Sequence, residues 1–219
     1  MAILLHVKIH VVFKVVPFAK ERILKSAISL VLVFIALSAA VVAQKPESAQ
    51  PIQLPPDVPM FSAADLAGKV PAAKAEDVKS MDAILAAIYD VISGPAGGRN
   101  WDRFRSLFLP QARFTQVATG PDGSKMVLTW NVDEFVRDAG QVFAKDPFYE
   151  KAIVNRPESF GNVTQVFSSY ASRRSPTAKP FERGINSIQL LNDGKRWWVL
   201  SILWDSERAG NPLPAKFAK

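Results

Sequence analysis

Two residue types that carry much of enzyme chemistry are absent from all or most of this chain. There is no cysteine among the 219 residues, which excludes disulfides, a thiolate nucleophile and a metal site with cysteine ligands. The only histidines are His6 and His10. A chain processed after residue 43 would therefore lack a histidine base, a Ser-His-Asp or Cys-His nucleophile system and a histidine-ligated metal. We predict no catalytic residue, no metal site and no cofactor.

The basic charge is unevenly distributed along the chain. The net charge is +7, of which residues 1–43 carry +4 and all later residues together carry +3. A basic N-terminal segment is weak evidence for nucleic-acid binding. We expect no nucleic-acid partner.

The N-terminal segment is typical of an export signal. Lys20, Arg22 and Lys25 precede the uncharged run "SAISLVLVFIALSAAVVA" at residues 26–43, and its small-residue end lies just before Gln44. This arrangement predicts a signal peptide and a periplasmic or secreted protein. The alternative is an uncleaved anchor, because 18 uncharged residues reach the lower limit for crossing a bilayer. The membrane would then be contacted only through residues 26–43.

The remaining chain divides into three parts. Residues 44–75 contain six prolines and no sustained periodicity, which predicts an extended, mobile tether. Residues 76–209 are the folded domain, and residues 210–219 are a C-terminal tail.

Three helices are predicted at the start of the domain. Ser80 precedes apolar residues at helical spacing up to Ile92, and Asn100 precedes a shorter helix that Pro110 is expected to end. Asn131 and Glu134 form a capping-box pattern that opens a helix through about Lys145.

The strands predicted for the domain come mainly after these helices. A hairpin at residues 112–119 and 125–130 flanks "GPDGS", and further strands are expected at residues 151–156, 163–173, 181–191 and 195–205. Asp193-Gly194 is a tight-turn dipeptide between the last two strands. The order predicts an α+β fold, with N-terminal helices packed on one face of a curved mixed or antiparallel sheet.

The last strand is apolar on both faces, with three tryptophans within eight residues. A two-residue turn at Asp193-Gly194 would pair Gln189 with Trp198, Ser187 with Leu200, Ile185 with Ile202 and Arg183 with Trp204. Large apolar groups beside a few polar ones are typical of a ligand cavity. Alternatively, the tryptophans are core, and Arg183 reaches water at the sheet margin.

A resemblance to a known superfamily joins these observations. The element order and the segments "WDRFRSLFLPQARF", "GNVTQVFSSYASRR" and "RGINSIQLLNDGKRWWVLSILWD" resemble the nuclear transport factor 2-like (SnoaL-like) superfamily, and more narrowly its exported bacterial members of unassigned function. The resemblance covers about residues 77–207. It implies a cone whose sheet wraps around an apolar pocket, with an outer face that often packs against a second subunit.

The resemblance supports the fold more strongly than the function. Its members include ketosteroid isomerases, dehydratases, polyketide cyclases and binding modules without catalysis. The isomerase pattern requires acids near the positions of Gln116 and Ser187, and Tyr89 is displaced from the expected register. Acid–base chemistry by Asp90, Tyr170 or Asp205 stays open.

These observations predict an exported, non-catalytic and homodimeric domain that binds a small ligand. The ligand is predicted to be small and partly apolar, and anionic if it satisfies Arg183. The alternatives are an isomerase, cyclase or dehydratase with an unrecognised acid–base residue, or a protein-interaction module. The pocket candidates are Phe108, Phe114, Trp130, Tyr170, Arg183, Ser187, Gln189, Trp198 and Trp204, and the interface candidates are Trp197, Val199 and Leu203.

Overall fold

A computed structural model describes residues 55–120 and 122–219, and residues 59–219 form one compact unit. The predicted signal or anchor segment lies outside the described residues. Residues 44–54 of the predicted tether also lie outside them. The described part of that tether contains a short helix, α2 (Ala63–Ala67), with a capping box between Ser62 and Asp65. Among the described residues, no helix is both long enough and apolar enough to cross a membrane.

The three predicted helix starts are confirmed. Helix α3 (Ala75–Val78) leads into α4 (Met81–Ile92), where the Ser80 hydroxyl accepts from the Ala83 amide. Asn100 caps α5 (Trp101–Ser106), and Asn131 and Glu134 form the capping box of α6 (Val132–Lys145). Pro110 does not end α5 as predicted. The helix already ends at Ser106, and Pro110 lies inside the following strand.

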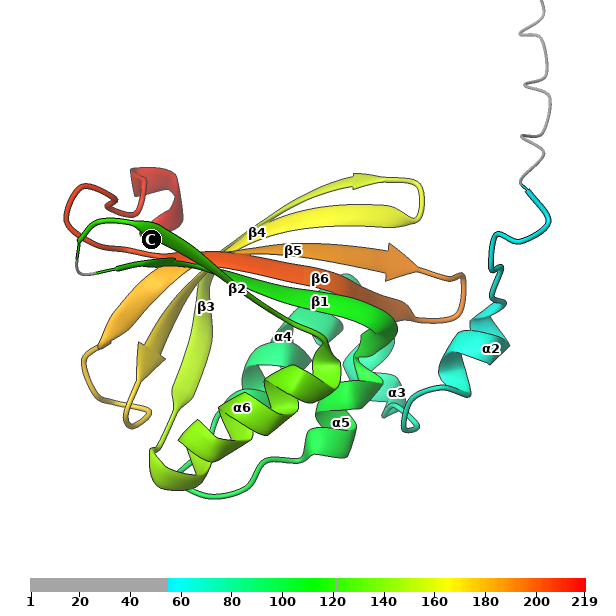
Figure 1. The fold of residues 1–219 in the computed structure, drawn as a ribbon, viewed down its shortest axis with the longest axis horizontal. Coiled ribbons are helices and arrows are strands. Elements are labelled where there is room, and N and C mark those ends of the chain that lie inside the picture. The colour runs from blue at the N-terminus through cyan, green and yellow to red at the C-terminus, as the bar shows by residue number, and fades with distance from the viewer. Residues whose placement is uncertain (1–54, 121) are drawn as a thin grey trace, which may run out of the picture. The chain divides into compact units, whose positions relative to one another are not determined.

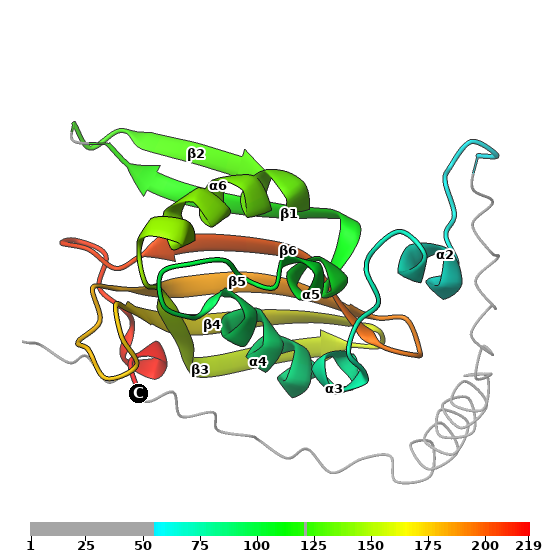
Figure 2. The ribbon, with the colours of Figure 1, turned by 90° about the horizontal axis from the view of Figure 1, so that it is seen from below.

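Six strands form a single curved sheet, and the predicted α+β class is confirmed. Its order is β2-β1-β6-β5-β4-β3, in which only the β1–β6 pair is parallel. Helices α4, α5 and α6 lie on one face, here called the inner face, and the C-terminal segment lies on the other, outer face (Figures 1 and 2). The strands are β1 (Phe108–Thr119), β2 (Lys125–Trp130), β3 (Tyr149–Phe160), β4 (Val163–Arg173), β5 (Glu182–Asn192) and β6 (Trp197–Ser206).

Aromatic side chains fill the inner face near β1. Phe104 from α5, Phe114 from β1 and Phe135 from α6 stack with ring centroids 4.4–5.8 Å apart. Buried aromatic pairs of this kind stabilise the packing of helices on a sheet. This half of the inner face is therefore closed core.

The predicted pairing between the last two strands is wrong. The Asp193 amide donates to the Arg196 carbonyl, and Asn192 pairs with Trp197, so four residues rather than two form the turn. The Asp193 carboxylate holds this wider turn by accepting from the amides of Lys195 and Arg196. A register shift at Leu200 then adds one more residue. Side chains alternate along a strand, so the two residues added to the turn leave the faces unchanged, whereas the single residue added at Leu200 exchanges them. Ile185 and Arg183 therefore lie on the face opposite to their predicted partners, Ile202 and Trp204.

The predicted C-terminal tail folds back on the outer face. Helix η1 (Ala215–Phe217) places Phe217, 5% exposed, edge-on against Phe167 of β4. The Arg156 side chain donates to the Lys216 carbonyl at 3.0 Å. Residues 210–219 thus belong to the packed unit.

Candidate binding groove between α4 and β3

An irregularity in β3 aligns three side chains on the inner face. Ala152 pairs with Tyr170 and Val154 with Ser169, so Ile153 is one extra residue in β3. Such a bulge reverses the alternation beyond it. Glu150 and Asn155, which would face opposite sides of a regular strand, therefore both face inward with Ala152.

These residues form one wall of a groove with a volume of about 400 Å³. The other wall is one side of α4, whose contributing residues recur at helical spacing. Apolar and polar groups are mixed, as is usual for small-molecule sites. The lining residues are Asp82, Leu85, Ala86, Tyr89 and Asp90 from α4, Ser93 directly after it, and Glu150, Lys151, Ala152 and Asn155 from β3.

Glu150 is the most perturbed acid in the groove. Its carboxylate accepts from the Ser172 hydroxyl at 2.7 Å. Burial raises the pKa of Glu150 to about 7 and the negative charge of Glu182 acts in the same direction, while hydrogen bonds from Ser172 and Asn186 oppose the rise. Near neutral pH both protonation states are populated, so Glu150 is able to accept or donate a proton.

Tyr89 belongs to a directed chain of hydrogen bonds beside Glu150. The Asn186 amide donates to the Tyr89 hydroxyl at 3.1 Å, and the Ser168 hydroxyl donates to Asn155 Oδ1 at 2.6 Å. Because the single proton of Ser168 is used in this way, Tyr89 must donate to Ser168 across the 2.6 Å contact. Burial, and then Glu150, raise the pKa of Tyr89, so it remains a neutral phenol.

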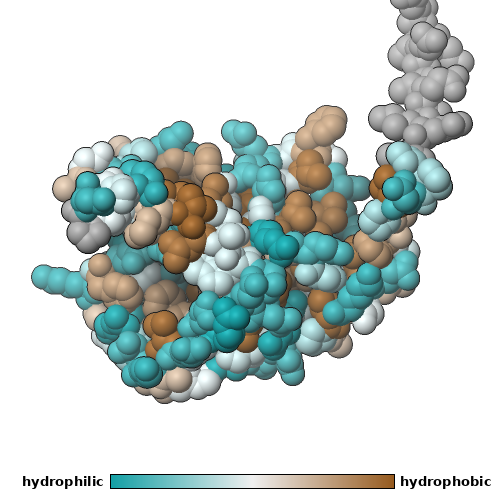
Figure 3. Space-filling model, in the orientation of Figure 1, coloured by the Kyte–Doolittle hydropathy of each residue, from teal (hydrophilic) through white to brown (hydrophobic). Residues whose placement is uncertain are grey.

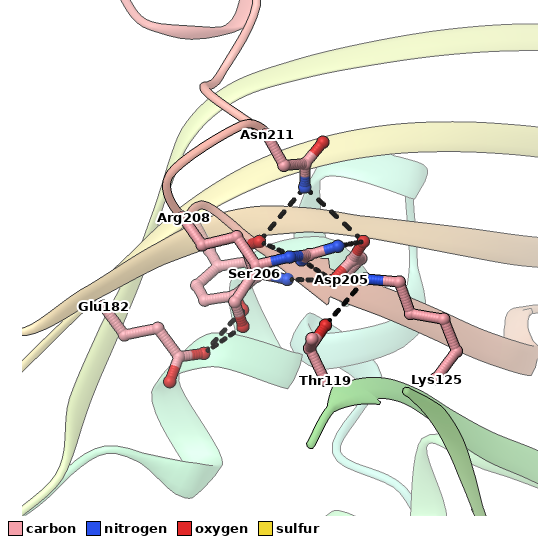
Figure 4. A network of polar contacts seen from close by, with 8 residues as sticks. Thr119, Lys125, Glu182, Asp205, Ser206, Arg208 and Asn211 are labelled. Carbon is pink, nitrogen blue, oxygen red and sulfur yellow. Dashed lines mark hydrogen bonds and ion pairs between the residues drawn. The ribbon is translucent and has the colours of Figure 1, made fainter. Parts of the chain in front are cut away.

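A second polar cluster lies on the inner face where β5 begins and β6 ends. The hydroxyls of Tyr170 and Ser206 both donate to Glu182 Oε1 at 2.8 Å. Figure 4 shows Ser206, at the end of β6 next to Asp205, bonded to Glu182 at the start of β5. Arg208 binds Asp205 through two nitrogens and lowers the pKa of that carboxyl. Asp205 is therefore held ionised, which disfavours it as the acid–base residue left open by the sequence.

The aromatic pocket candidates other than Trp198 lie on the inner face but away from the groove. Phe108 and Phe114 are buried core. Trp130 and Trp204 stack with centroids 6.0 Å apart, and the Trp130 ring nitrogen donates to Asp138. Of this predicted set, only Tyr170 lies in the polar clusters described above.

The polar pocket candidates lie on the outer face, and the expected Arg183–Trp204 contact is wrong. Arg183 donates to both oxygens of Glu207, at 2.8 and 3.0 Å. Ser187 accepts from Gln165, and Gln189 accepts from Ser201. Trp198 is also on the outer side and is fully buried, with the Arg196 guanidinium over its ring at 3.6 Å. The residue added to β6 at Leu200 is the cause, because one added residue exchanges the two faces of a strand.

Two of the three interface candidates are also misplaced. Val199 belongs to the buried core and Trp197 packs against it, so neither lies on the outer face. Leu203 is on the outer face and 45% exposed. The same register error accounts for this outcome.

Sequence reasoning missed Glu150 and Asn186. Glu150 falls one residue before the predicted strand, and a bulge leaves no simple mark in the alternation of polar and apolar residues. Tyr89 was identified only as displaced from the family pattern. The available signal was a glutamate near the start of one strand and a serine near the end of the next strand, which pair when the two strands are antiparallel.

Comparisons with known proteins give similarity in fold. Neither the protein-family models nor the curated proteins compared with this sequence match it. Solved structures do match. The chain is similar to nuclear transport factor 2-like proteins.

Three solved structures illustrate the similarity. An NTF-2 like protein of unknown function from Silicibacter pomeroyi is 10% identical, with 59% of this chain and 94% of that chain covered and a TM-score of 0.41. An NTF2-like protein of unknown function from Shewanella baltica is 16% identical, with 59% and 98% covered and a TM-score of 0.37. A protein of unknown function with a cystatin-like fold from Nostoc punctiforme is 6% identical, with 57% and 86% covered and a TM-score of 0.44. These similarities concern the fold alone.

Proposed function

We propose that this protein binds a small, partly apolar molecule in the groove between α4 and β3. The supporting observation is the Glu150 carboxylate, which lines the groove and is held by Ser172 rather than by a cation. Glu150 is partly buried. A partly buried acid without a structural ion pair is unfavourable for stability, and it is expected where function requires it. The earlier expectation of an anionic ligand depended on an inward Arg183, and it is not retained.

Molecules that remain bound through purification provide the test. The full-length chain would be purified, denatured and its small-molecule extract analysed by mass spectrometry. Ala86→Trp places a large ring in the groove, because Ala86 is exposed and lines it. Ala144→Trp is the matched control, an exposed alanine on α6 that does not line the groove.

We expect at least one compound in the wild-type and Ala144→Trp extracts that is depleted in the Ala86→Trp extract. Soaking that compound into crystals would then locate it. Identical extracts from all three proteins would contradict binding in this groove.

A second candidate is an enzyme that moves a proton, and the position of Glu150 favours it. A general base needs a pKa near the working pH, and burial brings the pKa of Glu150 to about 7. Glu150 would take a proton from a carbon next to a carbonyl and return one to the same molecule. Exchange of the α-protons of cyclohexanone in D2O, followed by NMR, is the test. Glu150→Gln should slow protein-dependent exchange by about 100-fold, and exchange no faster than in buffer alone would contradict this candidate.

We also propose that the protein is exported. The support is the charged flank and uncharged run at residues 20–43. N-terminal sequencing of protein from separated cell fractions should find a start at or near Gln44 outside the cytoplasm. An intact chain in membranes would indicate the anchor, and an intact Met1 in the cytosol would contradict export.

A further inference from the structure

We infer that the ligand of the α4–β3 groove carries an ammonium group, with Glu150 as its counter-ion, and a compact apolar body. This inference rests on the proposed binding function and specifies its ligand class. The support comes from the charges along the groove, the groups that face Glu150 and the nature of the walls.

The charges along the groove are mainly negative. Asp82, Asp90 and Glu150 line it, together with one base, Lys151. Lys151 pairs with Ala171, which places its side chain on the outer side of β3, opposite to Glu150. Arg103 already binds Asp90, near the end of α4, and Asp77 of α3. Glu150 thus supplies the unneutralised charge on the inner wall.

The groups packed around Glu150 from each neighbouring element are neutral or negative. Tyr89 faces it from α4, and burial raises its pKa, as it does for Tyr170 from β4, so both are uncharged phenols. Ser172 from β4 donates one hydrogen bond, and β5 contributes Asn186 and a second acid, Glu182. Across residues 55–120 and 122–219, no cation is among the groups that shift the pKa of Glu150.

An ammonium ion is the ligand group that this environment binds best. An ionised carboxylate in a partly desolvated site is unfavourable without a partner of opposite charge, and a charge-assisted hydrogen bond is among the strongest contacts available to it. A ligand carboxylate or phosphate would add repulsion from Glu150 and Glu182. The side chains of Leu85, Ala86 and Ala152 offer the apolar contacts for the rest of the molecule.

Three probes that share one aromatic ring and differ in charge measure the effect of the ligand charge on affinity. Benzylamine, benzyl alcohol and benzoate would be titrated into the full-length protein at pH 8 by calorimetry. We expect benzylamine to bind at least tenfold more tightly than benzyl alcohol, and benzoate to bind weakest. Glu150→Gln should remove the advantage of benzylamine and leave benzyl alcohol unchanged. Glu158→Gln is the matched control, an exposed glutamate on the same strand outside the groove.

The pH dependence of wild-type binding is a second readout, which stays valid if Glu150→Gln folds poorly. Lowering the pH from 8 to 5.5 protonates Glu150 and should weaken benzylamine binding about tenfold, with no change for benzyl alcohol. Equal affinity for benzylamine and benzyl alcohol, with no pH effect, would overturn the inference and leave the binding groove standing. Absence of benzylamine binding would overturn it too, while the extract experiment judges the groove separately.

Discussion

At the residue scale, Glu150 links the stability of the protein to pH. Its carboxyl has a pKa of about 7 in the folded chain, against an ordinary value of 4.5. The folded state therefore binds this proton more tightly than the unfolded state. Between pH 4.5 and 7 the folded chain holds more protons, so its stability falls as the pH rises through this window, and the full loss is present above pH 7.

Glu150→Gln should remove this loss, because glutamine does not ionise. The decrease in the free energy of unfolding between pH 4.5 and 8 should be about 1–3 kcal/mol larger for the wild type than for the variant. Urea unfolding followed by circular dichroism at pH 4.5, 6 and 8 measures it. Parallel pH profiles for the two proteins would show that Glu150 has an ordinary pKa.

Gly184 is required by the close packing of β5 against Tyr170. A Cβ at this position would lie 2.5 Å from the Asp205 carbonyl and 2.6 Å from the Tyr170 hydroxyl. Gly184→Ala should therefore lower the free energy of unfolding by about 1–3 kcal/mol or more, as overpacking does. Gly98→Ala is the control, because nothing lies within 4 Å of its Cβ. Equal stability of the two variants in urea would contradict the tight packing.

At the scale of elements, two features determine which side chains lie on the inner face and what covers them. The Ile153 bulge directs Glu150 and Asn155 to the same side of β3. The Asn131–Glu134 capping box starts α6, which covers the aromatic half of the sheet. The bulge is defined by pairing with the neighbouring strand β4, whereas the capping box depends on two residues that are three positions apart.

Asn131→Ala tests the contribution of the α6 capping box to stability. It removes the side-chain oxygen that accepts from the Glu134 amide at 2.9 Å, and it should destabilise the protein by about 1 kcal/mol. Asn162→Ala, at an exposed turn between β3 and β4, should change stability by less than about 0.5 kcal/mol. The difference in urea midpoint between these variants is the measurement, and no difference would mean that α6 does not depend on its cap.

At the scale of the whole molecule, the outer face remains partly apolar. The C-terminal segment covers part of it, and the exposed side chains of Phe167 and Leu203 lie beside the covered part. Figure 3 shows apolar side chains at the surface next to this segment. A contiguous exposed apolar patch is uncommon on monomers, which supports the proposal of a homodimer across this face.

Leu203→Glu places a charge at the centre of the proposed interface. Light scattering should give twice the chain mass for the wild type at micromolar concentration, and a shift toward the monomer for Leu203→Glu. Val142→Glu adds the same charge to an exposed position on α6, on the opposite side of the sheet, and should leave the dimer intact. A monomeric wild type would contradict the proposal.

The sequence by itself determined the main helices and strands of the domain and their order, but not α2 or η1. Helix caps and turn signals depend on residues three or four positions apart, so Ser80, Asn100 and Asn131 marked the helix starts correctly. Apolar periodicity likewise predicted the strands and the α+β class.

Tertiary structure alone decided which side chains meet. Which β5 and β6 side chains share a face depends on the residue added to β6 at Leu200. Their partners also depend on the turn, which the Asp193 carboxylate widened through contacts with Lys195, Arg196 and Trp198. The groove depends on an extra residue in β3 and on partners up to 97 positions apart, such as Asn186 and Tyr89. Local patterns carry no information about such distant pairs, because one added residue in a strand exchanges its two faces.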